Sequence, residues 1–413
     1  MGLIVQKYGG TSVGDLDRIQ NVARRVIKTV KAGHQVAVVV SAMAGETDEL
    51  VALAHGAGGD TPLAREYDAL LSTGEQKTIA LLAMTISQLG QPAQSFNGRQ
   101  AGIRTDAAHL RARIESIDTA NLRQVLDAGV VAVIAGFQGF DDGGNITTLG
   151  RGGSDTTAVA VAAALEADSC EIYTDVAGIY TADPNLVPSA RKLDRISYDE
   201  MLELSSLGAK VLQIRSAGFA MRYGVPLHVR SSFDDAEGTW VVSEEEVMEQ
   251  LLVSGVTYNR KEAKIRVRGV KDQPGIAAKI FLPISGAGIV VDMIVQNLSQ
   301  DGTTDLTFTV EKASYAQAIE IAQRLATEIG AAAVEGDENI AKVSIVGLGM
   351  KDHSGVASKM FQVLANEGIN IQLITTSEIK VSVLIDEKYA ELAVRALHDA
   401  FVGDGATEPV PES

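Results

Sequence analysis

The sequence contains a single cysteine, Cys170, and this scarcity excludes both a disulfide framework and a metal site built from several cysteines. The thiol lies in the apolar run Asp168–Tyr173, so we expect it in a hydrophobic core rather than as a nucleophile. Basic residues are also in deficit, with 36 Lys and Arg against 53 Asp and Glu and a net charge of −17. This balance disfavours nucleic acids and anionic membranes as partners, although a local basic pocket can still hold a small anion.

Long apolar stretches are absent as well. No run reaches the roughly 18 apolar residues that a membrane helix needs, and the first residues, MGLIVQKYGG, lack the charged segment and long apolar stretch of a signal peptide. With only one cysteine, a reducing, cytoplasmic location is expected. The histidines have no HxxxH or HExxH spacing, so no metal site made by the protein alone is predicted. His228, in PLHV, is expected to pack within a strand.

About the first 230 residues alternate short apolar runs with longer amphipathic segments, which predicts an α/β domain over residues 1–245. Strands are predicted at Leu3–Tyr8, Gln35–Ser41, Val130–Gly136, Ser169–Tyr173 and Pro226–Arg230. Helices are predicted between them, for example at Asp15–Ala32 and Gly74–Leu89. Runs that are apolar throughout, such as VVAVIAG, are typical of a mostly parallel sheet that helices cover on both faces.

The chain changes character after this domain. Between Gly238 and Ser254, the acidic stretch SEEEVMEQ predicts a helical connector between two folding units, with a surface helix inside one domain as the alternative. Beyond it, KDQPGIAAKIF at Lys271–Phe281 recurs 80 residues later as KDHSGVASKMF at Lys351–Phe361. We interpret the constant offset as an internal duplication of a βαββα unit, over residues 262–337 and 340–402, with a further strand near Ala332–Glu335. Residues 403–413, rich in Gly, Pro and acidic side chains, are predicted to be a disordered tail.

The motif KYGGTS, from Lys7 to Ser12, lies between the first predicted strand and the first predicted helix. Glycines let backbone N–H groups approach an anion, the following helix N-terminus adds partial positive charge, and Lys7 adds a full charge. The motif therefore suits a nucleotide phosphate, although it is not a Walker loop, because the lysine precedes the glycines. A tight strand-to-helix turn without a ligand is the alternative.

Two later segments also carry candidate chemistry. In LGRGGSD, at Leu149–Asp155, a guanidinium beside glycines is suited to grip a carboxylate. Ser154 or Asp155 would equally serve as the cap of the following helix. YTDVAGIYTADP, at Tyr173–Pro184, follows a strand at the edge where α/β proteins bind ligands, and an ordinary loop with aspartate turn formers is its alternative.

Two weaker signals complete the set. SAMAGET, at Ser41–Thr47, leaves the end of a predicted strand. STGE, at Ser72–Glu75, opens a predicted helix, where Glu75 would favour the N-terminal end of the helix dipole without any ligand. Neither motif indicates a function alone.

In this order, the motifs KYGGTS, SAMAGET, STGE, TTLGRGGSDTTA, YTDVAGIYTADP and GAKVL resemble those of the aspartate kinases in the amino acid kinase family. The repeated units resemble a tandem pair of ACT domains, ferredoxin-like βαββαβ modules that bind amino acids. The resemblance covers about residues 1–402. It implies an enzyme that uses ATP, with Mg²⁺, to phosphorylate the side-chain carboxylate of L-aspartate, the first step toward lysine, threonine and methionine. It also implies lysine, threonine or both as effectors.

The resemblance implies roles for individual residues. Lys7, Arg151 and Asp155 match catalytic positions, with Asp155 organising the lysine and the transferring phosphoryl group. The positions that match contacts to aspartate are Thr47, Glu75, Arg151 and Ser154, where Glu75 would meet the ammonium group and Arg151 a carboxylate. The positions that match contacts to ATP are Lys7, Gly9, Gly10, Ser41, Thr174, Asp175, Tyr180, Asp183 and Lys210. Asn185 stands where many relatives carry arginine, so no charged contact to ATP is expected there.

In the ACT pair, the implied effector pocket lies on a loop and an adjacent strand edge, whose backbone N–H and C=O groups suit an amino acid's carboxylate and ammonium. Its residues in the first copy would be Asp272, Gln273, Pro274, Gly275, Ile276, Ala277, Val290, Val291, Asp292 and Gln296. Those in the second copy would be Val356, Ala357, Asn370, Ile371, Ser377 and Glu378. For any one of them, a purely structural βα turn is the alternative. Because paired ACT modules usually meet across a dimer interface, a homodimer or higher oligomer is expected.

Two other functions fit part of the pattern. One is a kinase of the same fold that acts on glutamate, carbamate, acetylglutamate or a nucleotide, but the ACT pair and the RGGSD segment favour aspartate. The other is a non-catalytic amino-acid sensor, which would need the ACT modules alone. The presence of Lys7, Arg151 and Asp155 argues against the sensor.

Overall fold

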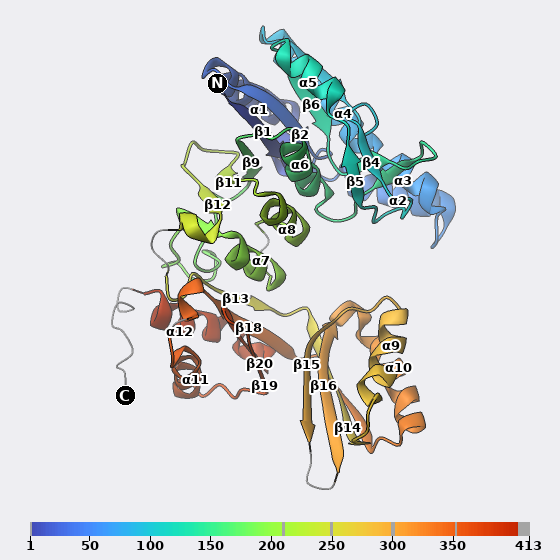
Figure 1. Cartoon of the computed structure of the whole chain (residues 1–413), viewed down its shortest axis with the longest axis vertical. Coiled ribbons are helices and arrows are strands. Elements are labelled where there is room, and N and C mark those ends of the chain that lie inside the picture. Colours follow the sequence, from blue (N-terminus) through green and yellow to red (C-terminus); the bar gives the residue numbers. More distant parts are fainter. Residues whose placement is uncertain (1, 209–210, 248–250, 299–301, 352, 404–413) are drawn as a thin grey trace. The chain divides into compact units, whose positions relative to one another are not determined.

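The computed structural model describes residues 2–208, 211–247, 251–298, 302–351 and 353–403 (Figure 1). The chain divides into two units. The first consists of Met1–Tyr180 and Lys192–Glu249, and the second consists of Thr181–Arg191 and Gln250–Ser413. The short segment Thr181–Arg191 therefore leaves the first unit, joins the second, and returns.

An eight-stranded sheet forms the centre of the first unit, in the order β10-β12-β11-β9-β1-β2-β6-β3. Its strands are β1 (Leu3–Tyr8), β2 (Gln35–Val40), β3 (Ala93–Phe96), β6 (Val131–Ala135), β9 (Ser169–Thr174), β10 (Arg195–Ser197), β11 (Leu227–Ser231) and β12 (Thr239–Val242). Neighbours pair in parallel, except that β11 and β12 are antiparallel. β2 reads QVAVVV and is buried beyond its first residue, as expected for a strand covered on both faces.

Helices cover the two faces, and successive residues of β1 point to opposite ones. Tyr8 belongs to a buried cluster with α1 (Leu16–Lys31) and α4 (Thr73–Gln88), whereas Lys7 pairs with a residue of α6 (Gly153–Ala164). Asp15 begins α1 by accepting a hydrogen bond from the backbone N–H of Arg18 at 2.8 Å. The other helices of this unit are α2 (Glu46–Gly58), α3 (Ala64–Leu71), α5 (Ala120–Asp127), α7 (Tyr198–Ser206) and α8 (Ile214–Tyr223), with 3-10 turns η1 (Gly10–Val13) and η2 (Glu244–Glu246).

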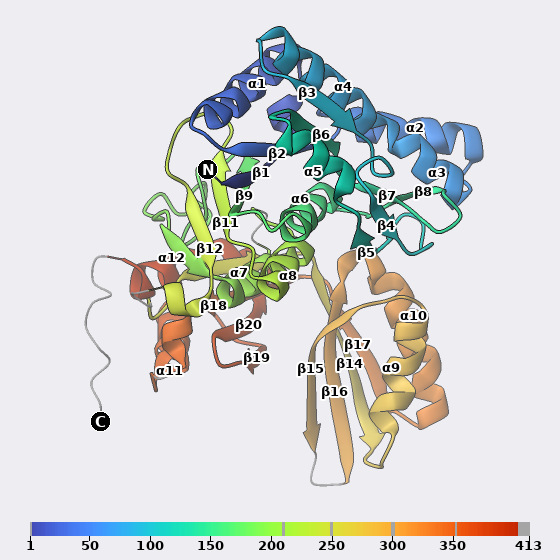
Figure 2. The same ribbon diagram turned by 45° about the horizontal axis from the view of Figure 1, so that its top comes forward.

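A second, small sheet lies in the same unit, in the order β5-β4-β7-β8, and α3 packs beside β8 (Figure 2). Its strands are β4 (Ile103–Thr105), β5 (Ile114–Ile117), β7 (Gln138–Phe140) and β8 (Ile146–Thr148). This sheet was not predicted, because three or four residues are too few to display the alternation of a strand.

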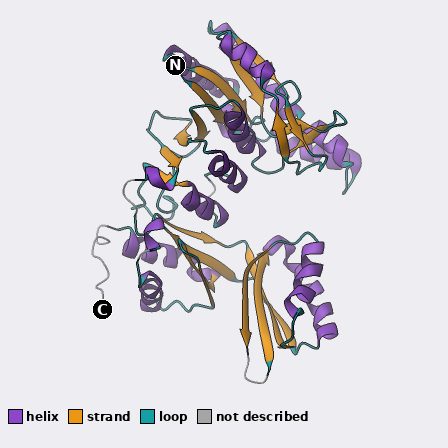
Figure 3. Cartoon of the chain, viewed as in Figure 1, coloured by secondary structure: helices purple, strands orange, loops and turns teal. Residues whose placement is uncertain are grey.

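The second unit contains two four-stranded sheets with helices (Figure 3). The first module runs β14 (Glu262–Lys271), α9 (Ile276–Gly286), β15 (Val291–Leu298), β16 (Thr303–Glu311), η3 (Lys312–Ser314), α10 (Tyr315–Ile329) and β17 (Ala333–Asp337). The second runs β18 (Ile340–Val346), η4 (Leu348–Met350), α11 (Val356–Asn366), β19 (Leu373–Thr376), β20 (Lys380–Asp386), η5 (Glu387–Tyr389) and α12 (Ala390–Phe401). Its fourth strand is β13 (Gly255–Asn259), which precedes the first module and pairs with β18. This contribution was not predicted.

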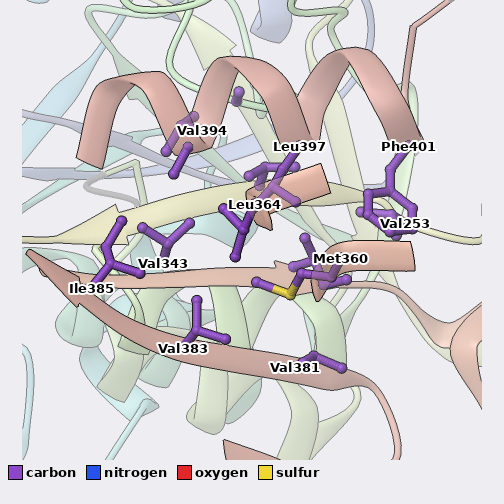
Figure 4. Close-up of a cluster of buried hydrophobic side chains, with 14 of the residues drawn as sticks. Val253, Val343, Met360, Leu364, Val381, Val383, Ile385, Val394, Leu397 and Phe401 are labelled. Carbon is purple, nitrogen blue, oxygen red and sulfur yellow. The ribbon is translucent and has the colours of Figure 1, made fainter. Parts of the chain in front are cut away.

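The hydrophobic core of the second module lies between its sheet and its helices, where Met360, Leu364 and Leu397 meet Val343 and Val383 (Figure 4). The segment Thr181–Arg191 joins this core through Ala182 and Val187. Thr181 Oγ1 also lies 2.9 Å from Nε2 of His398, a fully buried residue of α12. The segment is therefore built into the second module.

Most predicted elements are present, and the α/β fold with two ACT-like modules is confirmed. In the acidic stretch SEEEVMEQ, the described residues Ser243–Val247 contain a 3-10 turn at Glu244–Glu246 instead of the predicted α-helix, and residues 248–250 lie outside the described residues. The boundary between the two units falls within this stretch, as expected for a connector. As predicted, Cys170 is fully buried and His228 is a buried strand residue. The ring of His228 also stacks on Trp240, which was not predicted. Within the described ranges, no helix is both long and apolar enough to cross a membrane. The predicted tail lies outside the described residues from position 404 onward.

Candidate active site

Lys7 and Asp155 form an ion pair at the carboxyl-terminal edge of the large sheet. Lys7 is the penultimate residue of β1, and its Nζ lies 2.5 Å from Oδ1 of Asp155 in the first turn of α6. Their side chains are only 11% and 12% exposed. A charged side chain can be buried when it is paired with an opposite charge. Asp155 therefore holds the ammonium group of Lys7 at the edge where β1, β2, β6 and β9 all end.

Two glycines let the backbone pass close to this cation. A Cβ atom on Gly9 would lie 3.4 Å from Lys7 Nζ, so the ammonium group lies against the backbone of Gly9. A Cβ atom on Gly10 would lie 2.9 Å from the carbonyl oxygen of Ala42, which leaves no room for a side chain there. The loop after β1 is therefore a glycine-lined surface beside a positive charge, an arrangement that suits phosphate oxygens.

Glu75 lies near the same edge, in the first turn of α4. It is 3% exposed, and its Oε1 accepts a hydrogen bond from the backbone N–H of Ala42 at 3.0 Å. Its Oε2 has no hydrogen-bond partner within the described part of the chain. Burial, opposed by the backbone hydrogen bonds, raises the pKa of Glu75 to about 7. Oε2 of Glu75 can thus bind either a proton or the ammonium group of a ligand.

The RGGSD segment supplies the N-terminus of α6. Ser154 is buried, and a Cβ atom on Gly136, at the end of β6, would lie 2.7 Å from its Oγ. Arg151 is exposed and is flanked by Gly150 and Gly152, which have φ angles of +75° and +72°. These left-handed glycines turn the chain sharply on either side of the guanidinium group. Thr47 is half-buried in α2, which begins after the left-handed Gly45.

The residues predicted to contact ATP are only partly brought together. Ser41 follows β2 and its backbone N–H donates to Tyr8 O at 3.1 Å, while Thr174 ends β9 and donates to Asp175 Oδ1 at 3.1 Å. Tyr180, the last residue before the segment Thr181–Arg191, forms an isolated antiparallel β-bridge with Lys192, the first residue after it. Of the two remaining predicted residues, Asp183 belongs to the second unit, and Lys210 lies outside the described residues.

Asn185, at the position where the family resemblance led us to expect arginine, makes local hydrogen bonds. Its backbone N–H and its Nδ2 donate to Oδ1 of Asp183 at 2.9 and 3.1 Å. Both side chains are exposed. The pair therefore forms a polar turn with no positive charge of its own.

Two serines near the site, Ser12 and Ser232, were not among the predicted site residues. Ser12 Oγ lies 2.5 Å from Ser232 Oγ, and Ser232 also donates through its hydroxyl to Thr174 O at 2.9 Å. Ser232 follows β11, which is parallel to β9, so it reaches the edge where Lys7 lies. The signal was available, because PLHVRSS ends an apolar run with two hydroxyl side chains.

The predicted effector residues occupy equivalent places in the two modules. Gly275 and Gly355 are left-handed and precede α9 and α11, whose first residues, Ile276 and Val356, are buried. Val291, Asp292 and Gln296 lie on the edge strand β15, directly after the exposed Val290. In the second module, Asn370, Ile371, Ser377 and Glu378 flank the edge strand β19. The remaining predicted residues, Asp272, Gln273, Pro274, Ala277 and Ala357, lie in or directly after the two βα turns.

Asp292 already has a partner. It pairs with Lys342 of β18, a residue that is 4% exposed and also lies 2.5 Å from Glu262 of β14. Although burial alone would lower it, the two carboxylates raise the pKa of Lys342. The two modules of the second unit are therefore joined by a buried cation between two acids.

Comparison with known proteins identifies the family. The amino acid kinase family model matches residues 2–231, and an ACT domain model matches residues 265–324 and 343–401. An aspartate kinase of Pseudomonas fluorescens is 60% identical over 403 residues, which cover 97% of this chain and 98% of that protein. The chain belongs to the aspartate kinases of the amino acid kinase family. An aspartokinase of Mycolicibacterium smegmatis is 50% identical over 415 residues, covering 99% of this chain and 98% of that protein.

Solved structures of aspartokinases share the fold of this kinase. Escherichia coli aspartokinase III in complex with aspartate and ADP superposes with a TM-score of 0.81 and is 28% identical, covering 96% of this chain and 99% of that one. The same enzyme in complex with lysine and aspartate superposes with a TM-score of 0.76 and 29% identity, covering 97% and 99% of the two chains. The similarity therefore extends through both the kinase unit and the ACT modules.

Proposed function

We propose that this kinase transfers the γ-phosphoryl group of ATP to the side-chain carboxylate of L-aspartate, giving 4-phospho-L-aspartate and ADP. The observation that carries the proposal is the presence, at one sheet edge, of the buried Lys7–Asp155 ion pair and a buried carboxylate, Glu75, one oxygen of which has no hydrogen-bond partner among the described residues. The first suits phosphate, and the second suits an ammonium group. The aspartate and ADP in the related E. coli structure support this choice of substrates.

The reaction needs no general base to activate the attacking carboxylate. The side chain of aspartate has a pKa near 3.9 and is ionised at neutral pH, so its oxygen can attack phosphorus directly. The barrier lies in bringing two anions together in line. Lys7 and the backbone N–H groups at Gly9 and Gly10 offset charge on the phosphates, and Arg151 and Ser154 hold the amino acid with Glu75 and Thr47. Asp155 keeps the ammonium of Lys7 in position.

Mg²⁺ is expected to accompany the nucleotide. This ion prefers one or two carboxylates together with substrate phosphates over a cage made by the protein alone. Within the described residues, no three His, Cys, Asp or Glu side chains cluster as a metal site, while Asp155 lies beside the proposed phosphate position. These residues fit an ion that arrives with ATP and neutralises charge on its phosphates.

The ACT modules are proposed to bind lysine, threonine or both, and to favour a less active state of the enzyme. An effector shifts an equilibrium only if it binds one state more tightly, and the coupling is reciprocal. The lysine bound to E. coli aspartokinase III supports this role. Apolar side chains are exposed on β15 and β19, for example Ile294 and Ile374, and they support association of the modules into a homodimer or higher oligomer. We further propose that the enzyme acts in the cytoplasm in the first step toward lysine, threonine and methionine.

An ADP-release assay tests the function directly. The enzyme is supplied with ATP and Mg²⁺, with aspartate or glutamate as acceptor, and hydroxylamine is added to trap the acyl phosphate as a hydroxamate. We expect ADP and hydroxamate to appear in equal amounts with aspartate, and at least about 100-fold more slowly with glutamate, because a mispositioned carboxylate loses the benefit of alignment. ADP release without hydroxamate, or equal rates with both acceptors, would contradict the proposal.

A further inference from the structure

A fully buried carboxylate that the proposed chemistry does not use lies in α3. Asp68 is 0% exposed, and three donors converge on it. Thr148 Oγ1 lies 2.5 Å and His109 Nδ1 2.6 Å from its oxygens, and the backbone N–H of Leu110 lies 3.1 and 3.2 Å from Oδ1 and Oδ2. Since burying an acid is costly, so complete a set of donors indicates that this side chain has a defined task.

The task concerns an unfavourable backbone conformation. Leu110 has a φ of +68°, a left-handed conformation in which the Cβ of a residue other than glycine crowds the backbone. Both carboxylate oxygens of Asp68 accept from the N–H of this residue, and the preceding side chain, His109, is bonded to the same carboxylate. Asp68 therefore holds the turn at His109–Leu110 in a shape that leucine alone disfavours.

The turn at His109–Leu110 packs closely against the segment that precedes Arg151. A Cβ atom on Gly150 would lie 3.0 Å from Leu110 O. The backbone N–H of Ala112 donates to Thr148 O at 2.9 Å, and Arg215 bridges Leu149 O and Ala112 O at 2.6 and 3.2 Å. The turn and the segment Thr148–Gly150 thus form one braced unit, and Arg151 is the next residue.

We propose that Asp68 is a positioning residue for the amino-acid substrate. By holding the left-handed turn at Leu110, it fixes Gly150 and so directs the guanidinium group of Arg151 toward the substrate carboxylate. The last step rests on the function proposed for Arg151 above. The brace itself rests only on the hydrogen bonds and close contacts around Asp68.

Steady-state kinetics of the full-length Asp68→Asn variant test the proposal. The amide keeps the shape of the side chain but loses one acceptor oxygen. We expect the KM for aspartate to rise about tenfold, with the KM for ATP unchanged within about twofold. The matched control, Asp141→Asn, removes a buried carboxylate whose side chain bonds to Asn145 in the turn between β7 and β8, and should leave both KM values unchanged. An equal rise in both KM values in Asp68→Asn would overturn the proposal.

A second substitution makes the reasoning specific. Glycine adopts a φ of +68° without a Cβ penalty, so Leu110→Gly should make the turn independent of Asp68. In the double variant with Asp68→Asn and Leu110→Gly, the KM for aspartate should return to within about threefold of wild type. Failure of this rescue would overturn the role of the turn. If Asp68→Asn does not fold, His109→Ala provides an alternative test, because it keeps Asp68 and changes a side chain that is partly exposed. This variant should raise the KM for aspartate by about threefold.

Hydrogen exchange without substrate separates this proposal from the proposed function. Amides of residues 105–115 and 147–153 should exchange faster in Asp68→Asn than in wild type, and not in the double variant. If wild type makes no hydroxamate while this pattern appears, the proposed function fails and the brace is supported. Unchanged exchange in Asp68→Asn overturns the brace whatever the activity.

Discussion

Glu75→Gln should stabilise the kinase unit at alkaline pH while damaging aspartate binding. In the folded chain, Glu75 is 3% exposed with a pKa of about 7 rather than its ordinary 4.5, and burial is the largest cause. Between these two pKa values the folded chain holds a proton that the unfolded chain has released. Stability contributed at this position therefore falls as the pH rises from about 4.5 to about 7, and then stays constant.

The magnitude follows from the two pKa values. One pKa unit is worth about 1.4 kcal/mol, so a pKa raised from 4.5 to about 7 corresponds to a penalty of about 3 kcal/mol at pH 8. Most of that penalty is absent at pH 5, where the side chain is still protonated in the folded chain. Glutamine carries no charge at either pH. The stability of Glu75→Gln relative to wild type should thus improve by about 2–3 kcal/mol between pH 5 and pH 8.

Urea unfolding followed by tryptophan fluorescence measures this difference, because the single tryptophan, Trp240, lies in β12 of the first unit's sheet. Glu49→Gln, which removes an exposed carboxylate from α2, is the matched control and should show no such pH dependence. In wild type, kcat/KM for aspartate should also rise through pH 7 as Glu75 ionises to meet the ammonium group. An equal stability difference at pH 5 and pH 8 would refute the reasoning.

Three further predictions concern the charged groups of the site and the effectors. Lys7→Ala should lower kcat about 100-fold or more in the ADP-release assay, as expected when one electrostatic donor is lost, and near-normal turnover would remove Lys7 from the mechanism. Arg151→Ala should raise the KM for aspartate at least about tenfold more than the KM for ATP, and equal effects would contradict its assignment. Lysine or threonine at millimolar concentration should inhibit wild type and inhibit Asp292→Ala more weakly; no effect of either amino acid would disprove the regulatory proposal.

Five strands of the large sheet, β1, β2, β6, β9 and β11, could be predicted because they are locally distinct, whereas β3, β10 and β12 were not predicted. Leu3–Tyr8 was predicted with the same bounds as β1, since the apolar run ends at two glycines. The ACT-like modules were found through their repetition, which needs no structural information. The family motifs also placed Lys7 and Asp155 in one site, although they are 148 positions apart.

Other features depend on contacts that no local pattern encodes. β13 completes a sheet whose other strands begin at Ile340, and β12 was hidden in a stretch that looked like a connector. In the sequence, Asp68 resembles a surface residue of a short helix. Only the structure shows that Thr148 and His109 form hydrogen bonds with it. The raised pKa of Glu75 likewise arises from burial, which the motif STGE does not reveal.

The contacts of Asp155 and Glu75 explain how a site that contains two acids can bind two anions, ATP and aspartate. Four ionisable side chains carry the proposed chemistry: Lys7 and Arg151 are cations, and Asp155 and Glu75 are acids. Asp155 is neutralised by Lys7 at 2.5 Å, and Glu75, with a pKa of about 7, is largely protonated in slightly acid solution. In slightly acid solution these side chains thus leave almost no uncompensated negative charge in the site, despite the chain's net charge of −17. When aspartate binds, its ammonium group replaces the proton on Glu75, so a local negative charge develops only where a positive charge arrives to meet it.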